Sequence, residues 1–290
     1  MKTLSIIIIL ALLGPVAMAQ KTKTLQADNT KPFVLGVIDE IQSAQLGEKR
    51  ILNIYLPDGY KDDTARYSVI YLLDGSADED FIHVAGLVQF NSFPWINRIQ
   101  KTILVGIANV DRKRDFTYET TLKEDKKSYP TTGHSDKFVS FIEKELQPYI
   151  EKKYHANKSR TIIGESLGGL LATEILLKKP ALFDKYIIIS PSLWWDNGSL
   201  LRLPSPIYGD GITQKISVYI GVGKEGVWPA VTPHVMEVDA NLLADKLKNT
   251  KSKSVTVYFD YLPQEDHATI GHQAIFNAIR ILFPAPAENK

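Results

Sequence analysis

The chain has 290 residues, of which 44% are hydrophobic, and this length is sufficient for one α/β domain with a large core. Its 34 basic residues nearly balance its 33 acidic residues, so we expect no field that attracts polyanions and no nucleic acid partner. The absence of cysteine excludes a disulfide framework, a thiol nucleophile, a cysteine metal site and a lipid-modified leader cysteine.

The first 19 residues have the pattern of a secretory signal peptide. Lys2 provides a positive charge, residues 4–13 form an apolar core, and Ala17 and Ala19 form a small-x-small cleavage site. The apolar stretch is too short to span a bilayer comfortably, and an uncleaved anchor is the alternative. We expect cleavage after Ala19, no stable membrane insertion afterwards, and a periplasmic or secreted protein.

Residues 20–32 are polar and rich in lysine, and they predict a flexible lead-in to a single domain that covers residues 33–290. Apolar and polar residues alternate in the first two segments of this domain, 33–41 and 50–56. Alternation on both sides of a short turn is typical of a hairpin with one buried face. The sequence therefore predicts antiparallel strands at one edge of a sheet.

Beyond the hairpin, short apolar runs alternate with segments of helical periodicity. The runs predict one strand that ends at Gly164 and five others, at residues 67–73, 101–108, 186–190, 216–222 and 254–262. Helices are predicted directly after Ser166 and at residues 81–90, 135–154, 232–247 and 270–282. Residues 109–133 have no clear period and predict a long polar loop. Such alternation predicts an α/β fold with a mostly parallel central sheet and helices on both faces.

The strongest motif is Gly164-Glu165-Ser166-Leu167-Gly168, which lies between a predicted strand and a predicted helix. A side chain at Gly164 or Gly168 would collide with neighbouring backbone in the sharp strand-to-helix turn that this motif requires. The amide dipoles of the helix would stabilise an oxyanion beside the serine. We predict that Ser166 is a nucleophile; a purely structural glycine turn is the alternative.

A histidine and an acid follow Ser166 in the chain order of α/β-hydrolase triads. His267 lies just after the last predicted strand, where an imidazole can take the serine proton and return it to the leaving group. Glu225 follows the preceding strand and is the first candidate for the acid. Asp266, Asp239 and a serine–histidine dyad without a strong acid stay open as alternatives.

The sequence predicts neither a metal nor another cofactor. His267 and His272 are five residues apart, which does not match the i, i+4 spacing of two histidines that share a metal on a helix. We therefore expect Ser166, His267 and Glu225 to act as catalytic residues and none of the site residues to bind a metal.

Backbone donors for an oxyanion hole are expected from two turns. The N–H of Leu167 follows the nucleophile, and a second N–H is expected from Gly75 or Ser76, because this fold takes its second donor from the loop after its third strand. Gly75 could also be a turn glycine with no catalytic part.

Three tryptophans lie in loops on the predicted face of Ser166. Trp194, Trp195 and Trp228 could line a substrate pocket or act as packing anchors. Arg114, with Arg112 in the same loop, could hold a polar or anionic substrate or form a surface ion pair.

The chain resembles the esterase D-like branch of the α/β-hydrolases, which includes enterobactin-type siderophore esterases, feruloyl and acetyl esterases, S-formylglutathione hydrolases and mycolyltransferases. The resemblance rests on the segments 71–75, 114–117, 164–169, 190–195 and 266–269. It implies an α/β-hydrolase fold without a large cap domain, with Ser166 and His267 as catalytic residues and Glu225 at the position of the acid. Because some siderophore esterases in this branch work with a weakened or absent acid, the dyad alternative stays open.

Together these observations predict a secreted serine esterase that hydrolyses carboxylic esters through an acyl-enzyme on Ser166. The expected partner is a small-molecule ester: an acylated sugar, a feruloyl or other aryl ester, or a siderophore ester. An acyltransferase on the same scaffold and a non-catalytic binding protein are the alternatives. The sequence indicates no particular oligomeric state.

Overall fold

The computed structural model describes residues 31–60, 65–229 and 232–283. The predicted signal peptide lies outside the described residues, and so does the predicted lead-in apart from residues 31 and 32. The chain divides into two compact units, Met1–Val34 and Leu35–Lys290. The described residues of the first unit have no regular secondary structure, and all the helices and strands given below belong to the second unit.

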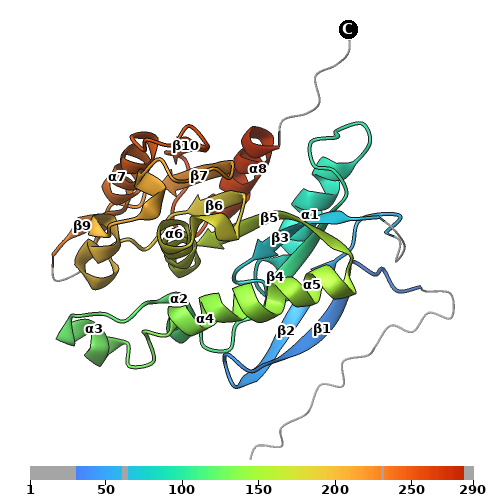
Figure 1. Cartoon of the computed structure of the whole chain (residues 1–290), viewed down its shortest axis with the longest axis horizontal. Helices are drawn as coiled ribbons and strands as arrows, with labels where there is room; N and C mark the ends of the chain where they lie inside the picture. The colour runs from blue at the N-terminus through green and yellow to red at the C-terminus, as the bar shows by residue number, and fades with distance from the viewer. Residues whose placement is uncertain (1–30, 61–64, 230–231, 284–290) are drawn as a thin grey trace, which may run out of the picture. The chain divides into compact units, whose positions relative to one another are not determined.

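The second unit contains an eight-stranded sheet with the strand order β1-β2-β4-β3-β5-β6-β7-β10 (Figure 1). Strand β2 is antiparallel to both of its neighbours, β1 and β4, and every other neighbouring pair is parallel. The strands are β1 (Val37–Ser43), β2 (Glu48–Tyr55), β3 (Tyr67–Leu72), β4 (Thr102–Ile107), β5 (Ala156–Glu165), β6 (Lys185–Ile189), β7 (Ile216–Gly223) and β10 (Val255–Leu262). The sheet is thus mostly parallel with antiparallel N-terminal edge strands, as the sequence predicts.

Helices cover both faces of this sheet. One hydrophobic cluster contains residues of α1 (Phe81–Ser92) and α8 (Ile270–Leu282). The other contains residues of α4 (Ser135–Phe141), α5 (Gln147–Lys153), α6 (Leu167–Lys178) and α7 (Met236–Lys248). Successive residues of β3 alternate between the clusters, because successive side chains of a strand point to opposite faces. A central strand covered on both faces must be apolar throughout, which explains the continuous apolar runs.

The long connection after β4 differs from the predicted loop. It contains two short helices, α2 (Arg112–Phe116) and α3 (Lys123–Ser128). The side chain of Asp111 accepts a hydrogen bond from the Arg114 N–H at 3.0 Å and so caps α2. Segments this short carry too little periodicity to be detected in the sequence.

Two predicted helices also have different boundaries. The helix predicted at 135–154 is divided by a π-helical turn, η1 (Ile142–Leu146), which ends two residues before Pro148, whose ring nitrogen cannot donate a helical hydrogen bond. Helix α7 begins at Met236, because the residues before it form a small hairpin of β8 (Val227–Trp228) and β9 (His234–Val235). Three 3₁₀ segments complete the unit: η2 (Pro180–Leu182), η3 (Trp195–Arg202) and η4 (Pro206–Tyr208).

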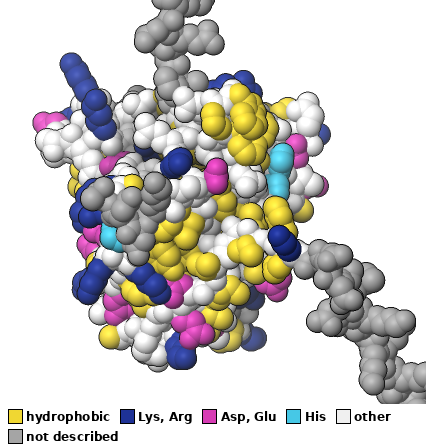
Figure 2. Space-filling model, turned by 90° about the vertical axis from the view of Figure 1, so that its right-hand side faces the viewer, with side chains coloured by type: hydrophobic (Ala, Val, Ile, Leu, Met, Phe, Trp, Pro, Cys, Tyr) yellow, Lys and Arg dark blue, Asp and Glu magenta, His cyan; other side chains and the backbone are white. Residues whose placement is uncertain are grey.

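The surface of the described residues is mixed in character. On the face shown in Figure 2, side chains of Lys and Arg are interspersed with those of Asp and Glu and with hydrophobic patches. None of the helices in residues 31–60, 65–229 and 232–283 has the length and apolar character needed to cross a membrane.

Candidate active site

The site is organised around the turn that joins β5 to α6. Ser166 occupies this turn with φ 57° and ψ −117°, a left-handed conformation that L residues rarely adopt. Its N–H donates to the carbonyl of Ile189 at 3.0 Å, and its carbonyl accepts from the Leu170 N–H at 2.9 Å. These bonds hold the strained backbone, as expected for a nucleophile presented at the carboxyl ends of the strands.

Two glycines make the turn possible. A Cβ at Gly164 would lie 2.4 Å from the carbonyl oxygen of Gly168, and a Cβ at Gly169 would lie 2.8 Å from the carbonyl oxygen of Ile189. A Cβ at Gly168 would meet nothing closer than a side-chain oxygen of Asp74 at 3.3 Å. The expected collision is therefore present at Gly164, but the second tight position is Gly169 and not Gly168.

The candidate base reaches the candidate nucleophile. His267 lies in the connection from β10 to α8, and its Nε2 is 3.0 Å from the Oγ of Ser166. The connection is shaped by Asp266, whose Oδ1 accepts the N–H groups of Ala268 and Thr269 at 2.9 and 3.1 Å. Asp266 is thus occupied in the turn, and the structure gives it no bond to the imidazole of His267.

Glu225 completes the chain of hydrogen bonds. It follows β7, its side chain is 3% exposed, and its Oε2 is 2.5 Å from Nδ1 of His267. Its other oxygen accepts hydrogen bonds from the hydroxyl of Ser190 and, at 3.2 Å, from the N–H of Gly223. The third candidate acid, Asp239, instead binds Nδ1 of His234 at 2.7 Å. Of the three acids, only Glu225 contacts His267.

These contacts set the charges of the pair. The hydrogen bond that His267 donates to Glu225 outweighs burial and raises the pKa of His267 above its usual value. Burial alone raises the pKa of Glu225, but the hydrogen bonds of His267 and Ser190 outweigh it and leave that pKa below its usual value. An ionised carboxylate beside Nδ1 favours the tautomer in which Nε2 can accept a proton from Ser166.

The predicted oxyanion donors differ in availability. Leu167 is the first residue of α6, so its N–H is among those with no acceptor inside the helix. The N–H of Gly75 donates to the carbonyl of Ile107 at 3.1 Å, which removes it as a donor. Ser76 remains; its N–H is 3.3 Å from a carboxylate oxygen of Glu79, a long contact that a substrate oxygen could replace.

A close backbone contact, and not a catalytic role, explains why a glycine stands at position 75. A Cβ at this position would lie 2.3 Å from the Cα of Gly106 on the neighbouring strand. The glycine therefore allows the chain after β3 to pass close to β4.

A cavity of about 300 Å³ opens beside Ser166 and His267. The indole rings of Trp194 and Trp228 stack in its wall, with centroids 4.6 Å apart and planes 13° apart. Trp195 also borders the cavity, but it is 1% exposed and its Nε1–H donates to the carbonyl of Tyr118 at 3.0 Å. Trp228, which is 38% exposed, thus offers most of the accessible aromatic surface, whereas Trp194 lies beneath it with 9% exposed and Trp195 mainly anchors the loop.

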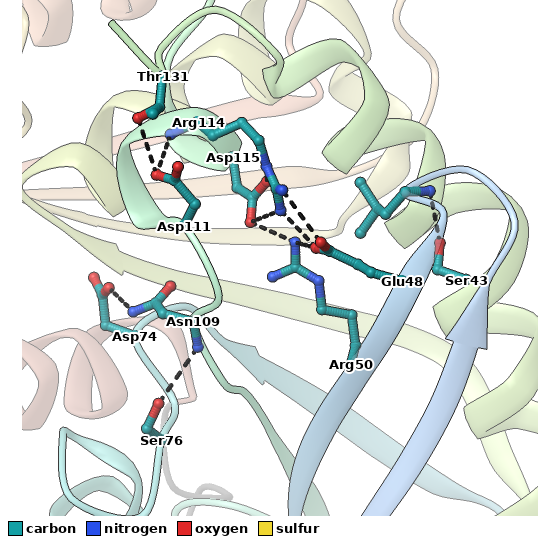
Figure 3. A network of polar contacts seen from close by, with 11 residues as sticks. Ser43, Glu48, Arg50, Asp74, Ser76, Asn109, Asp111, Arg114, Asp115 and Thr131 are labelled. Carbon is teal, nitrogen blue, oxygen red and sulfur yellow. Dashed lines mark hydrogen bonds and ion pairs between the residues drawn. The ribbon is translucent and has the colours of Figure 1, made fainter. Parts of the chain in front are cut away.

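Arg114 does not reach this cavity. Its guanidinium binds Glu48 at 2.5 Å and Asp115 at 2.8 Å, and Asp115 also binds the buried Arg50 at 2.5 Å (Figure 3). The ion-pair alternative is therefore correct for Arg114, which lies outside the lining of the cavity. The sequence alone could not show this, because Glu48 lies on β2, far from α2 in the chain.

Arg112 and Lys113 line the cavity in place of Arg114. Arg112 forms two hydrogen bonds with Asp74, at 2.6 and 2.9 Å, and a third with the carbonyl of Glu165 at 3.3 Å. Burial, with smaller contributions from nearby acids, raises the pKa of Glu165 to about 7. Lys113 places its ammonium 5.1 Å from the ring centroid of Tyr129.

Three further residues of the site, Ser190, Tyr129 and Gly169, are not among those predicted from the sequence. Ser190 directly follows β6, has φ 40° and belongs to a segment that the family resemblance includes, but its bond to Glu225 joins the ends of two strands, which the sequence does not show. Tyr129 lies in the predicted loop and carried no signal. Within the described residues, no three His, Asp or Glu side chains are grouped so that they could hold a metal ion.

Comparison with known proteins gives the family. A family model described as "Putative esterase" matches residues 43–260. The ferri-bacillibactin esterase BesA of Bacillus subtilis is 36% identical over 197 residues, which are 63% of this chain and 68% of BesA. The chain belongs to this esterase family. The protein is thus a carboxylic ester hydrolase with the α/β-hydrolase fold.

Two further relatives support the assignment. The esterase is 32% identical to an IroE-like serine hydrolase from Shewanella oneidensis, with a TM-score of 0.74 over 86% of this chain and 80% of that one. A siderophore enterobactin esterase of Emericella nidulans is 43% identical over 72 residues, which are 24% of each protein.

Proposed function

We propose that the esterase cleaves its substrate through an acyl-enzyme on Ser166. The observation that supports this proposal is the continuous chain of hydrogen bonds from Ser166 through His267 to Glu225, in which Ser166 and His267 line the aromatic cavity. Nε2 of His267 takes the hydroxyl proton as the serine oxygen attacks the ester carbonyl, and Glu225 stabilises the resulting imidazolium. The N–H groups of Leu167 and Ser76 hold the oxyanion.

Collapse of this tetrahedral intermediate breaks the bond to the alcohol, which leaves with the proton from His267. A water molecule then gives a proton to His267 and attacks the acyl carbon, and a second collapse releases the carboxylic acid and restores the hydroxyl of Ser166.

The substrate that we propose is a siderophore ester with an aromatic acyl group. BesA and the Emericella nidulans relative are named for ferri-bacillibactin and enterobactin. The exposed ring of Trp228, which stacks on Trp194, provides an aromatic surface in the cavity that Ser166 lines. Lys113 adds positive charge at the same cavity, whereas the charge of Arg112 is paired with Asp74.

A substrate panel tests this proposal. Hydrolysis is measured with short 4-nitrophenyl esters, acetylated sugars, methyl ferulate and catecholate siderophore esters, for the natural chain and for Ser166→Ala. We expect kcat/KM to be highest for the siderophore esters and all hydrolysis to disappear in the variant. A preference for acetylated sugars would overturn the substrate, and hydrolysis retained by Ser166→Ala would overturn the nucleophile.

We also propose that residues 1–19 are a signal peptide and that residues 33–290 form the exported single catalytic domain. The support is the charged start, apolar core and small-x-small site of the leader. N-terminal sequencing of protein from the periplasm or medium should begin at Gln20; an intact Met1 in membrane fractions would indicate an uncleaved anchor.

A further inference from the structure

Among the described residues, two side chains contact the oxygen of the nucleophile, and one of them is not part of the triad. The Oγ of Ser192 lies 3.3 Å from the Oγ of Ser166, and Ser192 lines the same cavity. Ser192 is 2% exposed, and within the described residues the structure gives its hydroxyl no hydrogen-bonding partner other than Ser166. A buried hydroxyl in a protein usually has such a partner, and here the partner is the reacting oxygen itself.

The backbone holds Ser192 against the turn of the nucleophile. Its N–H donates to the carbonyl of Ser166 at 3.0 Å, and its carbonyl accepts from the N–H of Trp195 at 3.1 Å. Pro191 lies close to Gly169, where an added Cβ would be 3.0 Å from the Cα of Pro191. The loop that carries Ser192 therefore packs directly on the first turn of α6.

The same loop contacts both ends of the triad. The hydroxyl of Ser190 donates to the carboxylate of Glu225, whereas Ser192, two residues further on, faces Ser166. His267 joins these two ends through its two ring nitrogens. Two hydroxyls from one short loop thus contact the first and the last member of the hydrogen-bonded chain.

The protons of the triad decide which of the two serines donates. The ionised Glu225 favours a proton on Nδ1 of His267, so Nε2 is an acceptor. The only hydroxyl hydrogen of Ser166 is directed at this Nε2, at 3.0 Å, and its Oγ can then only accept from Ser192. The contact of 3.3 Å is long for an O–H···O bond, but catalytic hydrogen bonds often tighten in the transition state.

We propose that Ser192 is a further catalytic residue, which donates a hydrogen bond to the Oγ of Ser166 while that oxygen carries negative charge. In acylation, charge grows on Oγ as its proton moves to Nε2 of His267 and its bond to the ester carbon forms. In deacylation, charge returns to Oγ as its bond to the acyl carbon breaks and His267 gives the proton back. A donor held in place beside this oxygen stabilises both transition states. The inference rests on the proposed acyl-enzyme mechanism.

The kinetic test is Ser192→Ala with 4-nitrophenyl acetate as the substrate. The variant loses the hydroxyl but keeps the backbone bond to the carbonyl of Ser166, so the turn remains held. Loss of a hydrogen bond to a charged oxygen corresponds to about a tenfold to hundredfold fall in rate. Because the bond acts in the transition states, kcat and kcat/KM should fall together and KM should change little.

Ser135→Ala is the matched control. Ser135 is 1% exposed on α4, its hydroxyl has no partner within the described residues, and it does not line the cavity at Ser166. This variant loses the same oxygen from an equally buried position and should keep the kcat of the natural enzyme, with circular dichroism to confirm that both variants fold. An unchanged kcat in Ser192→Ala, or a raised KM alone, would show that its hydroxyl does not act on the nucleophile and would overturn the proposal.

A single-turnover measurement separates this proposal from the acyl-enzyme mechanism itself. Diethyl 4-nitrophenyl phosphate reacts once with an active serine. The bond from Oγ to phosphorus forms, the bond from phosphorus to the aryl oxygen breaks, 4-nitrophenolate leaves, and the serine proton passes to His267. The rate of this release should fall in Ser192→Ala by a factor similar to that of kcat, and peptide mapping should find the diethylphosphoryl group on Ser166 in both proteins.

The two ways in which this measurement can fail are distinct. Equal rates of release in both proteins, with Ser166 modified, would overturn the role of Ser192 and leave Ser166 as the nucleophile. Ester hydrolysis by a natural enzyme whose Ser166 the phosphate does not modify would overturn the acyl-enzyme mechanism, and the role of Ser192 with it.

Discussion

Replacement of Glu225 by glutamine is expected to reverse the proton arrangement of His267. In the natural protein one oxygen of Glu225 accepts from the Gly223 N–H and the Ser190 hydroxyl, while the other faces Nδ1 of His267. The backbone N–H of Gly223 cannot rotate away, so in Glu225→Gln it should retain the single oxygen of the side-chain amide. The amide nitrogen then faces the ring, which must accept at Nδ1 and carry its proton on Nε2.

A ring protonated on Nε2 cannot take the proton of Ser166. The comparable tautomer error in a Ser-His-Asp enzyme lowers kcat by about 10⁴-fold, and we expect a loss of this order for Glu225→Gln with little change in KM. The pair also predicts a pH effect. Because Glu225 raises the pKa of His267, the acid limb of kcat/KM lies above the ordinary histidine value, and the residual activity of the variant should extend to lower pH.

The assay is steady-state hydrolysis of 4-nitrophenyl acetate between about pH 5 and pH 9, with circular dichroism to confirm folding. Ser190→Ala is the matched control: it removes one hydrogen bond to Glu225 but leaves the carboxylate, so a loss of only about tenfold is expected. A loss below about tenfold for Glu225→Gln, with an unmoved acid limb, would contradict the reasoning and favour a serine–histidine dyad.

Three further outcomes follow from contacts around the site. Since burial raises the folded pKa of Glu165 to about 7, the folded state loses stability as pH rises above the ordinary glutamate value. Urea unfolding of Glu165→Gln should therefore give a free energy of unfolding about 1–3 kcal/mol higher than that of the natural protein at pH 8 but an equal one at pH 4. The same difference at both pH values would refute this. Gly169→Ala should destabilise the protein by about 3 kcal/mol and Gly168→Ala by about 1 kcal/mol or less, measured by urea unfolding; the reverse order would contradict the backbone contacts. Arg114→Ala should lower the free energy of unfolding by about 1–3 kcal/mol, because it removes one partner of the buried Asp115. The variant should keep the KM of the natural enzyme; a raised KM would mean that Arg114 does bind the substrate.

The fold was predictable because its signals are local and repeated. The helix predicted at residues 270–282 is α8, with the same boundaries, since its apolar residues recur at helical spacing along one buried face. The apolar run at 67–73 differs from β3 by one residue. The hairpin at the N-terminal edge follows from alternation in the same way. Where no period exists, as in residues 109–133, the two short helices were missed.

The site was predictable only where the chain itself carries the constraint. Ser166 is marked by its flanking glycines, and His267 and Glu225 by their positions after strands. Contacts between distant segments left no such mark. The tight position of Gly169 depends on backbone at the end of β6, and the partner of Arg114 lies on β2. Such pairings depend on which strands become neighbours, which one sequence does not reveal.

The most direct test of the account is mass spectrometry of the enzyme during turnover. Acid quench within the first turnovers of a 4-nitrophenyl ester should reveal a protein heavier by one acyl group, and peptide mapping should place that group on Ser166. The acyl adduct should be absent in Ser166→Ala. Steady hydrolysis by the natural enzyme without any acyl adduct, or an adduct on another residue, would contradict the proposed role of Ser166.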